Sequence, residues 1–181
     1  FFTTIKQAQA DQVLRPEITD DVIAHLERIA PQTNDTRVRF ATMMSLLPSA
    51  VVTTFCQRYR APNQFRELAK LASQHRQTIM QLDTESPESI LSLFSKTDAL
   101  RRPERFFQLF QSINQAFPKP QHSWLNELLT ALTSIDTSAL QHQGLKGKAF
   151  ADALRQQRLT LTHDWLENNP GKLFHTEQMI E

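Results

Sequence analysis

The histidines are the first residues to consider for catalysis or metal binding, because imidazole acts as a general base and as a metal ligand near neutral pH. The chain has six of them, and no two stand three or four residues apart, the spacing that puts two ligands on one helix face. His163-Asp164 is the nearest approach to a metal-binding pair. Adjacent helical residues diverge by about 100° around the helix axis. We therefore expect this pair to lie on a solvated helical turn without converging on an ion.

The other reactive residues also favour structural roles. Asp20 and Asp21 are typical of the first turn of a helix, where acids interact favourably with the macrodipole. Cys56 lies on an apolar stretch between Phe55 and Tyr59, so we expect a buried and unreactive thiol. The sequence contains no GxSxG, no Walker A and no GxGxxG pattern. It therefore predicts no catalytic residue and no metal site in this chain.

The basic residues are more informative, because they gather in three clusters. They are Arg58, Arg60, Arg66, Lys70 and Arg76; Lys96, Arg101, Arg102 and Arg105; and Lys146, Lys148, Arg155 and Arg158. Arginine binds phosphates through paired hydrogen bonds, and such clusters hold nucleic acid without reading its sequence. Gly147, between two lysines, opens a predicted helix whose free N–H groups favour a phosphate. The alternative is that these are ordinary solvated helix faces, since the net charge is only +1.

Composition narrows the fold class and the classes of function. Only 3 of the 181 residues are Gly, against 9 Pro, which argues against hairpin-rich β folds and phosphate-binding loops. Hydrophobic residues make up 40% and charged residues 22%, as in an ordinary soluble globular protein. The single Cys excludes an internal disulfide, so we expect a reducing, cytoplasmic location. No run of 18 apolar residues and no charged leader is present, so we expect neither a membrane span nor a signal peptide.

Apolar residues recur at helical spacing almost throughout, which predicts an all-α chain of about eight helices. The expected helix starts lie at Thr19, Asp35, Pro48, Pro62-Asn63, Ser86-Pro87-Glu88, Pro103-Glu104, Ser123 and Gly147. The most polar interruption is Phe117–Gln121, where two prolines bar helix. It divides a helical body (1–117) from a helical tail region (118–181), unless the two form one continuous domain. The chain opens at Phe1 without an initiator Met, so we expect a piece of a longer protein.

Four blocks of the sequence carry a resemblance to a known family. Residues 38–47 resemble V-R-F-A-T-L-x-H-D-L, and residues 57–71 resemble Q-R-L-R-x-P-N-x-x-R-x-L-A-x-L. Residues 93–105 are similar to L-F-x-x-x-D-A-x-R-x-P-x-R, and residues 144–147 to G-x-K-G. These patterns belong, in this order, to bacterial CCA-adding tRNA nucleotidyltransferases. The chain thus resembles the C-terminal region of that family, a degenerate HD domain followed by a tail.

Departures from the family pattern are as informative as the matches. The family's His-Asp pair falls on Ser45 and Leu46, which cannot ligate a divalent metal. A Gly/His-rich insert that supplies further metal ligands in the family is missing from this chain. The first histidine of the family's HD domain would lie near His25. The resemblance therefore implies a lost HD metal site, without metal-dependent phosphohydrolase activity. The family's nucleotidyltransferase head is also absent, so the parent would use Mg with ATP and CTP while this chain carries no cofactor.

Together, the basic clusters and the resemblance lead to one hypothesis. The chain would hold tRNA by its backbone, so that the 3′ end reaches the catalytic head of the same parent chain. The predicted phosphate contacts are Arg58, Arg66, Lys146, Gly147, Lys148, Arg155 and Arg158. The main alternative is a protein-interaction or dimerisation module, which would form a homodimer. A third alternative, a phosphoesterase with other metal ligands, lacks a His/Asp cluster in the sequence.

Overall fold

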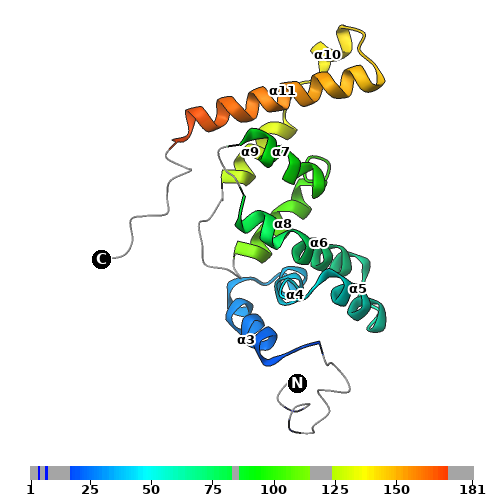
Figure 1. The fold of residues 1–181 in the computed structure, drawn as a ribbon, viewed down its shortest axis with the longest axis vertical. Coiled ribbons are helices and arrows are strands. Elements are labelled where there is room, and N and C mark those ends of the chain that lie inside the picture. The colour runs from blue at the N-terminus through cyan, green and yellow to red at the C-terminus, as the bar shows by residue number, and fades with distance from the viewer. Residues whose placement is uncertain (1–3, 5–6, 8–16, 83–85, 115–123, 171–181) are drawn as a thin grey trace, which may run out of the picture. The chain divides into compact units, whose positions relative to one another are not determined.

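The computed structural model describes residues 4, 7, 17–82, 86–114 and 124–170, which form helices joined by short turns (Figure 1). The helices are α3 (Asp20–Ile29), the 3-10 helix η1 (Ala30–Gln32), α4 (Thr36–Met44), α5 (Ser49–Arg58), α6 (Asn63–Met80), α7 (Pro87–Lys96), α8 (Pro103–Asn114), α9 (Trp124–Thr133), α10 (Ser138–His142) and α11 (Gly147–Asn168). No strand occurs among these residues, so the all-α prediction is confirmed. The short helix α10 is an addition that the sequence did not predict.

The chain divides into two compact units. Unit 1 comprises residues 1–79 and 108–118, and unit 2 comprises residues 80–107 and 119–181. The boundary falls inside α8, whose first residues belong to unit 2 and whose later residues belong to unit 1. The predicted boundary between body and tail lies at 117–121, outside the described residues, and that division stays a prediction.

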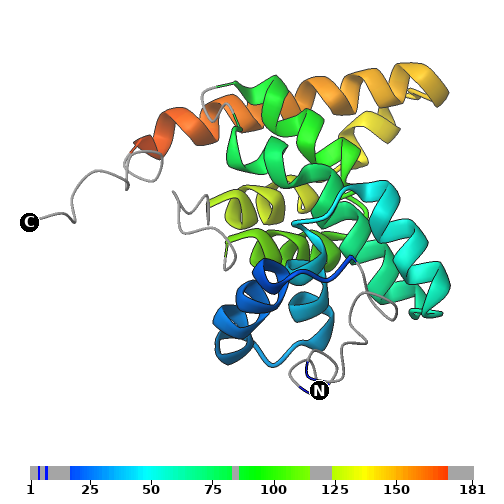
Figure 2. The same ribbon diagram turned by 60° about the horizontal axis from the view of Figure 1, so that its bottom comes forward.

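Unit 1 has its apolar core where α3 and α4 pack on each other, as the blue helices of Figure 2 show. The core cluster consists of Ile18, Val22, Met43, Met44, Val52, Cys56 and Ala69. The later part of α8 is tied to it by polar bonds. Thr42 Oγ1 donates to the Ser112 carbonyl at 3.0 Å, and Gln108 Nε2 donates to Asp35 Oδ2 at 3.0 Å. The thiol of Cys56 is buried, as predicted, and burial raises its pKa.

Unit 2 is built around α11, which packs against α7 and α9 in both whole-molecule views (Figures 1 and 2). Trp124 of α9 stacks on Trp165 of α11 with the ring centroids 5.5 Å apart. Phe94 of α7 meets Phe106 edge to face at 5.1 Å. One face of α9 is fully buried, through Trp124, Leu125, Leu128, Leu129 and Leu132. This packing fixes α11 and its basic residues against the rest of the unit.

Three predicted helix starts are confirmed by their caps. Thr19 Oγ1 accepts from Val22 N at 3.5 Å, and Ser86 Oγ accepts from Ser89 N at 3.2 Å. Asp35 caps α4 by accepting from the Arg37 backbone N–H at 2.9 Å. Each cap satisfies an N–H that the first helical turn leaves without a partner. The predicted start at Ser123 lies outside the described residues.

Two helices end in a Schellman motif without the usual glycine. After α5, Arg60 N donates to Gln57 O at 3.2 Å and Ala61 N donates to Cys56 O at 2.9 Å, with Arg60 at φ +50°. After α7, the equivalent left-handed residue is Asp98, at φ +57°. Left-handed backbone costs L-residues other than glycine about 1–2 kcal/mol. A chain with only 3 glycines thus turns these corners with charged residues instead.

Candidate functional site

The predicted contacts Arg58 and Arg66 lie at the exposed corner between α5 and α6. Arg58 Nη1 pairs with Glu17 Oε1 at 2.8 Å, and its side chain is 46% exposed. Arg66 Nη2 donates to Asn63 Oδ1 at 2.7 Å across one turn. The bond from Arg66 to Asn63 is exposed and is readily exchanged for another acceptor, whereas the carboxylate of Glu17 is only 14% exposed and holds Arg58 more firmly. The corner also exposes Tyr59, which is 45% accessible.

The start of α11 displays the predicted lysines. Lys146 is the N-cap residue in extended backbone and forms no side-chain cap, and Lys148 is exposed in the first turn. Gly147 stands between them at φ +57°, and a Cβ built there would meet nothing within 4 Å. Its left-handed backbone favours glycine for conformational reasons. This end of α11 therefore offers two ammonium groups beside backbone N–H groups and the positive end of the helix dipole.

Farther along α11, Arg155 and Arg158 have different environments. Arg155 is exposed, whereas Arg158 is half-buried. The Arg158 Nε atom is buried without a hydrogen-bond partner, and burial lowers the pKa of its guanidinium. The step from Lys148 to Arg158 is ten residues, or about 15 Å along a helix axis. Unit 2 thus holds five of the seven predicted phosphate contacts on one helix and its cap.

A cluster of arginines surrounds one carboxylate after α7. Arg101 Nη2 lies 2.8 Å from Asp98 Oδ2, Arg105 Nη2 lies 3.4 Å from the same oxygen, and Arg102 Nε lies at 3.6 Å. Arg105 Nη2 also donates to the Thr97 carbonyl at 3.0 Å. Hydrogen bonds from Arg101 are the largest cause that holds the pKa of Asp98 below its ordinary value; desolvation opposes them, and the charges of Arg101, Arg105 and Arg102 add to them. Asp98 thus stays ionised and organises the corner between α7 and α8.

The arginine cluster borders a hollow of about 360 Å³ that Arg158 also lines. The hollow is formed by Phe94, Ser95, Asp98, Leu100, Arg101 and Arg158. Sequence reasoning chose Arg158 but passed over Asp98 and Arg101 as site residues. The signal that could have found them is the D-A-x-R-x-P-x-R block at residues 98–105. Sequence spacing alone could not pair residues 98–101 with residue 158, because helix packing brings them together.

The positions of the family's His-Asp pair are structural here. Ser45 ends α4 and is buried, with its hydroxyl donating to the Thr42 carbonyl at 2.7 Å. Leu46 packs against the core cluster of unit 1. His25 lies on α3 and is buried, and its Nδ1 lies 2.6 Å from Arg28 Nη2. Because arginine can only donate, Nδ1 is the acceptor in this bond. Of Ser45, Leu46 and His25, only His25 has a side chain of a type that commonly ligates a metal ion.

The side chains of His163 and Asp164 come closer together than the divergence of adjacent helical residues suggested, and the expectation that they bind no ion stays a prediction. His163 Nδ1 lies 3.7 Å from Asp164 Oδ1, and His163 Nε2 lies 3.6 Å from Glu167 Oε1. One potential ligand atom from each of these three residues lies within 4.8 Å of the others. The prediction considered the directions of Cβ bonds, but long side chains and the i,i+4 position of Glu167 close the gap. His163 and Asp164 are solvent-exposed, as predicted, and so is Glu167; this is the single such group in the described part of the chain.

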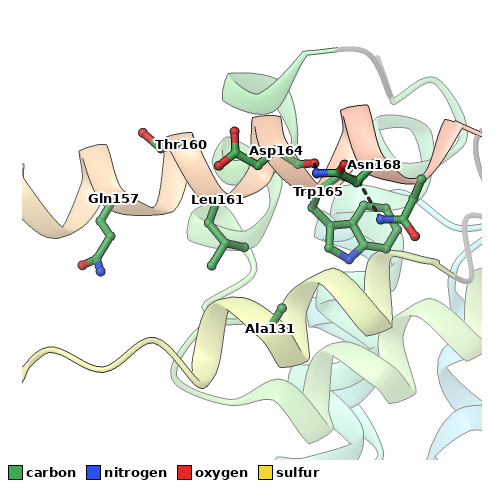
Figure 3. Close-up of a pocket in the computed structure, with 8 residues that line it drawn as sticks. Ala131, Gln157, Thr160, Leu161, Asp164, Trp165 and Asn168 are labelled. Atoms are coloured by element: carbon green, nitrogen blue, oxygen red, sulfur yellow. Dashed lines mark hydrogen bonds between the residues drawn. The ribbon is translucent and has the colours of Figure 1, made fainter.

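A second hollow, of about 560 Å³, lies between α9 and α11 and is shown in Figure 3. Trp165 and Leu161 provide its apolar wall, together with Ala131 of α9. Asn168 Nδ2 donates to the Asp164 carbonyl at 2.7 Å and Asn169 Nδ2 to the Trp165 carbonyl at 2.8 Å (dashed in Figure 3), so both amides cap the end of α11. Its one charged lining group is a carboxylate. An anion therefore fits the arginine-lined hollow and not this one.

Comparison with curated proteins finds relatives along nearly the whole chain. CCA-adding enzymes from two strains of Coxiella burnetii are 36% identical to it over 167 residues, which is 88% of this chain. The chain is similar to CCA-adding enzymes along most of its length. The CCA-adding enzyme of Pseudomonas putida is 31% identical over 172 residues, again 88% of this chain. The match is consistent with the C-terminal region that the four sequence blocks predicted.

The homologues are longer than this chain. It covers 43% of each Coxiella burnetii enzyme and 45% of the Pseudomonas putida enzyme, so it spans less than half their length. No protein-family model matches the chain, and no solved structure gives a significant match. Among the described residues, no helix has the length and the apolar character that a membrane crossing requires.

Proposed function

We propose that the chain is the tRNA-holding C-terminal part of a CCA-adding enzyme. The observation that carries this proposal is the homology to CCA-adding enzymes over 88% of the chain. In the proposal, a catalytic head elsewhere in the same parent binds Mg, ATP and CTP, and this chain grips the tRNA backbone. The chain itself carries no catalytic residue, and the protein works in the cytoplasm.

The start of α11 supports backbone recognition by its chemistry. Lys146 and Lys148 are exposed, and each supplies a flexible ammonium group. Gly147 lets a phosphate approach the backbone, because no side chain stands in front of it. Arg155 extends this basic surface along the helix. Such groups contact phosphates and do not discriminate bases, which suits an enzyme that must accept many tRNAs.

Arg58 and Arg66 provide a second set of proposed tRNA-phosphate contacts, in unit 1. Each is exposed. Arg66 can release its surface partner Asn63 at little cost, whereas Arg58 keeps its pair with the largely buried Glu17 and offers its remaining donors to a phosphate. A bound phosphate makes charge-assisted hydrogen bonds with a guanidinium and releases counterions. Both arginines therefore add affinity that falls with salt and is independent of tRNA sequence.

The same proposal includes the loss of the HD metal site. The buried hydroxyl of Ser45 is committed to a backbone carbonyl, and Leu46 is part of the apolar packing. Neither is a metal ligand, and His25 faces the guanidinium of Arg28. In this proposal the degenerate domain keeps its helical scaffold as a support for tRNA contacts.

A charge-reversal experiment tests the proposal. Replacing Lys146 and Lys148 with Glu in the 181-residue chain reverses the charge beside the N-terminus of α11 without touching the core. We expect at least a tenfold loss of tRNA affinity by fluorescence anisotropy, and a salt slope smaller by about 2. The matched control is Lys70→Glu, an exposed lysine on α6 that is not among the proposed contacts.

Unchanged tRNA affinity in the Lys146 and Lys148 variant would contradict the proposal. If the chain instead binds no tRNA and its mass rises with concentration, the homodimer or interaction module becomes the better account. Sedimentation at several protein concentrations distinguishes these two results.

A further inference from the structure

The hollow beside the α7–α8 corner is lined by more cationic than anionic side chains. Asp98 pairs with Arg101, Arg102 and Arg105, and Arg158 reaches the same hollow from α11. Among the residues that line the hollow, one carboxylate, Asp98, thus stands beside two guanidiniums, those of Arg101 and Arg158. A group of cations held this closely attracts an anion of more than one charge.

Arg158 is the member of this group that most needs a partner. In the described part of the chain its side chain makes no hydrogen bond or ion pair, and its Nε atom is buried. Partial burial without a counterion disfavours the charged form and lowers the guanidinium pKa. A buried charge-bearing donor without a partner costs free energy, which a bound acceptor restores.

Arg101 provides a second set of donors at the mouth of the hollow. Its bonds to Asp98 use Nε and Nη2, and the described residues place no acceptor on Nη1. The side chain is 71% exposed, so a ligand can reach it from solvent. Phe94 and Leu100 line the hollow beside these donors and reduce the water that competes for them.

We propose that the hollow formed by the α7–α8 corner and α11 is a binding site for a phosphate group, held by Arg158 and Arg101. Asp98 is a positioning residue, which holds the Arg101 guanidinium by its Nε edge. The hollow, at about 360 Å³, is large enough for a phosphate and its first waters. Arginine is the side chain whose planar donors match phosphate oxygens in pairs.

The phosphate can come from two sources, a tRNA backbone or a free phosphate compound. The tRNA source rests on the proposed function, while binding of the phosphate group itself does not. Recognition by Arg158 and Arg101 is the same in both cases. The two sources are separated by experiment.

The first arm uses inorganic phosphate and the full 181-residue chain. We expect the NMR signal of Arg158 Nε–H to shift and saturate on phosphate addition, at constant ionic strength set with chloride. Arg158→Gln should weaken this binding by at least about tenfold, and Arg101→Gln should weaken it as well. The matched control is Lys96→Gln, which removes one exposed positive charge from α7 and lines no part of the hollow.

Two further variants guard against a merely structural effect. Arg158→Lys keeps the positive charge but loses the planar donors, and should bind phosphate more weakly than the unaltered chain and more strongly than Arg158→Gln. If Arg158→Gln does not fold, as judged by circular dichroism, the exposed Arg101→Gln still tests the site. An unmoved Arg158 signal, or equal phosphate binding by Arg101→Gln, Arg158→Lys and the unaltered chain, would overturn the proposal.

The second arm adds tRNA to the phosphate-bound chain. Displacement of phosphate by tRNA supports the site with an RNA phosphate as its occupant. Phosphate binding that tRNA does not displace supports the site with a free phosphate compound as its occupant. Absence of phosphate binding overturns this inference even where Lys146 and Lys148 still bind tRNA, so its failure is distinct from failure of the proposed function.

Discussion

At the residue scale, two charged residues adopt left-handed backbone at helix ends, where glycine would be less strained. Arg60 ends α5 at φ +50° and is exposed, whereas Asp98 occupies the same position after α7 and pairs with three arginines. Strain of this kind is retained where the side chain contributes something that glycine cannot. For Asp98 that contribution is visible in its ion pairs, and Arg60 adds a cation beside Arg58 and Tyr59.

Arg60→Gly should stabilise the chain, because glycine adopts this backbone without strain. The expected gain is up to about 1 kcal/mol in the free energy of unfolding. Urea denaturation followed by circular dichroism measures it. Arg60→Ala, the control, removes the same side chain but keeps the Cβ, so it should give no gain. Equal stability changes in the two variants would show that backbone strain at residue 60 is not the cause.

Stability should fall as the pH drops below about 6.5, in part because of His25. Burial first, then Arg28 and Arg76, lower the pKa of this imidazole in the folded state. The unfolded chain therefore binds a proton at a higher pH than the folded chain, and unfolding becomes more favourable as pH decreases through that window. His25→Gln keeps an acceptor for Arg28 but does not titrate, so its urea midpoint should decline less from about pH 7.5 to about pH 5.5. Parallel curves for the two chains would exclude His25 as a source.

At the element scale, most helices could be predicted because their capping residues and apolar spacing are local features of the sequence. Asp35 and Ser86 accept from backbone N–H groups at the starts of α4 and α7, where caps were predicted. The short α10 was not predicted, because Ser138–His142 carries too few apolar residues to show a helical period. Pro48 is the N-cap of α5, one residue before the predicted first-turn position.

Ser86→Ala should cost about 1 kcal/mol of stability, because it removes the acceptor for the Ser89 N–H at the start of α7. Ser89→Ala is the matched control, since its backbone N–H keeps the Ser86 acceptor and alanine favours helix. Thermal and urea unfolding of both variants give the comparison. If Ser89→Ala lowered stability as much as Ser86→Ala, the Ser86 cap would not be the cause of the loss.

At the scale of the whole molecule, packing places side chains together in ways that the sequence does not reveal. The blocks around residues 98–105 and 155–158 were both noticed, yet only the contact of α7 with α11 joins Asp98, Arg101 and Arg158 around one hollow. The closeness of His163, Asp164 and Glu167 was also not foreseen, because side-chain reach matters as much as backbone direction. Fold class and family region depend on pattern and order along the chain, and these were predictable.

The most direct test of the central claim is the salt dependence of tRNA binding by the 181-residue chain. Fluorescence anisotropy at about 50 and 200 mM salt should show affinity falling by roughly a thousandfold if all six proposed side-chain contacts engage phosphates at once. tRNA should also bind more tightly than a single-stranded RNA of equal length, since the grip follows the folded backbone. Absence of binding at the lower salt concentration, or binding that is equal for both RNAs and insensitive to salt, would contradict a role for this chain in holding tRNA.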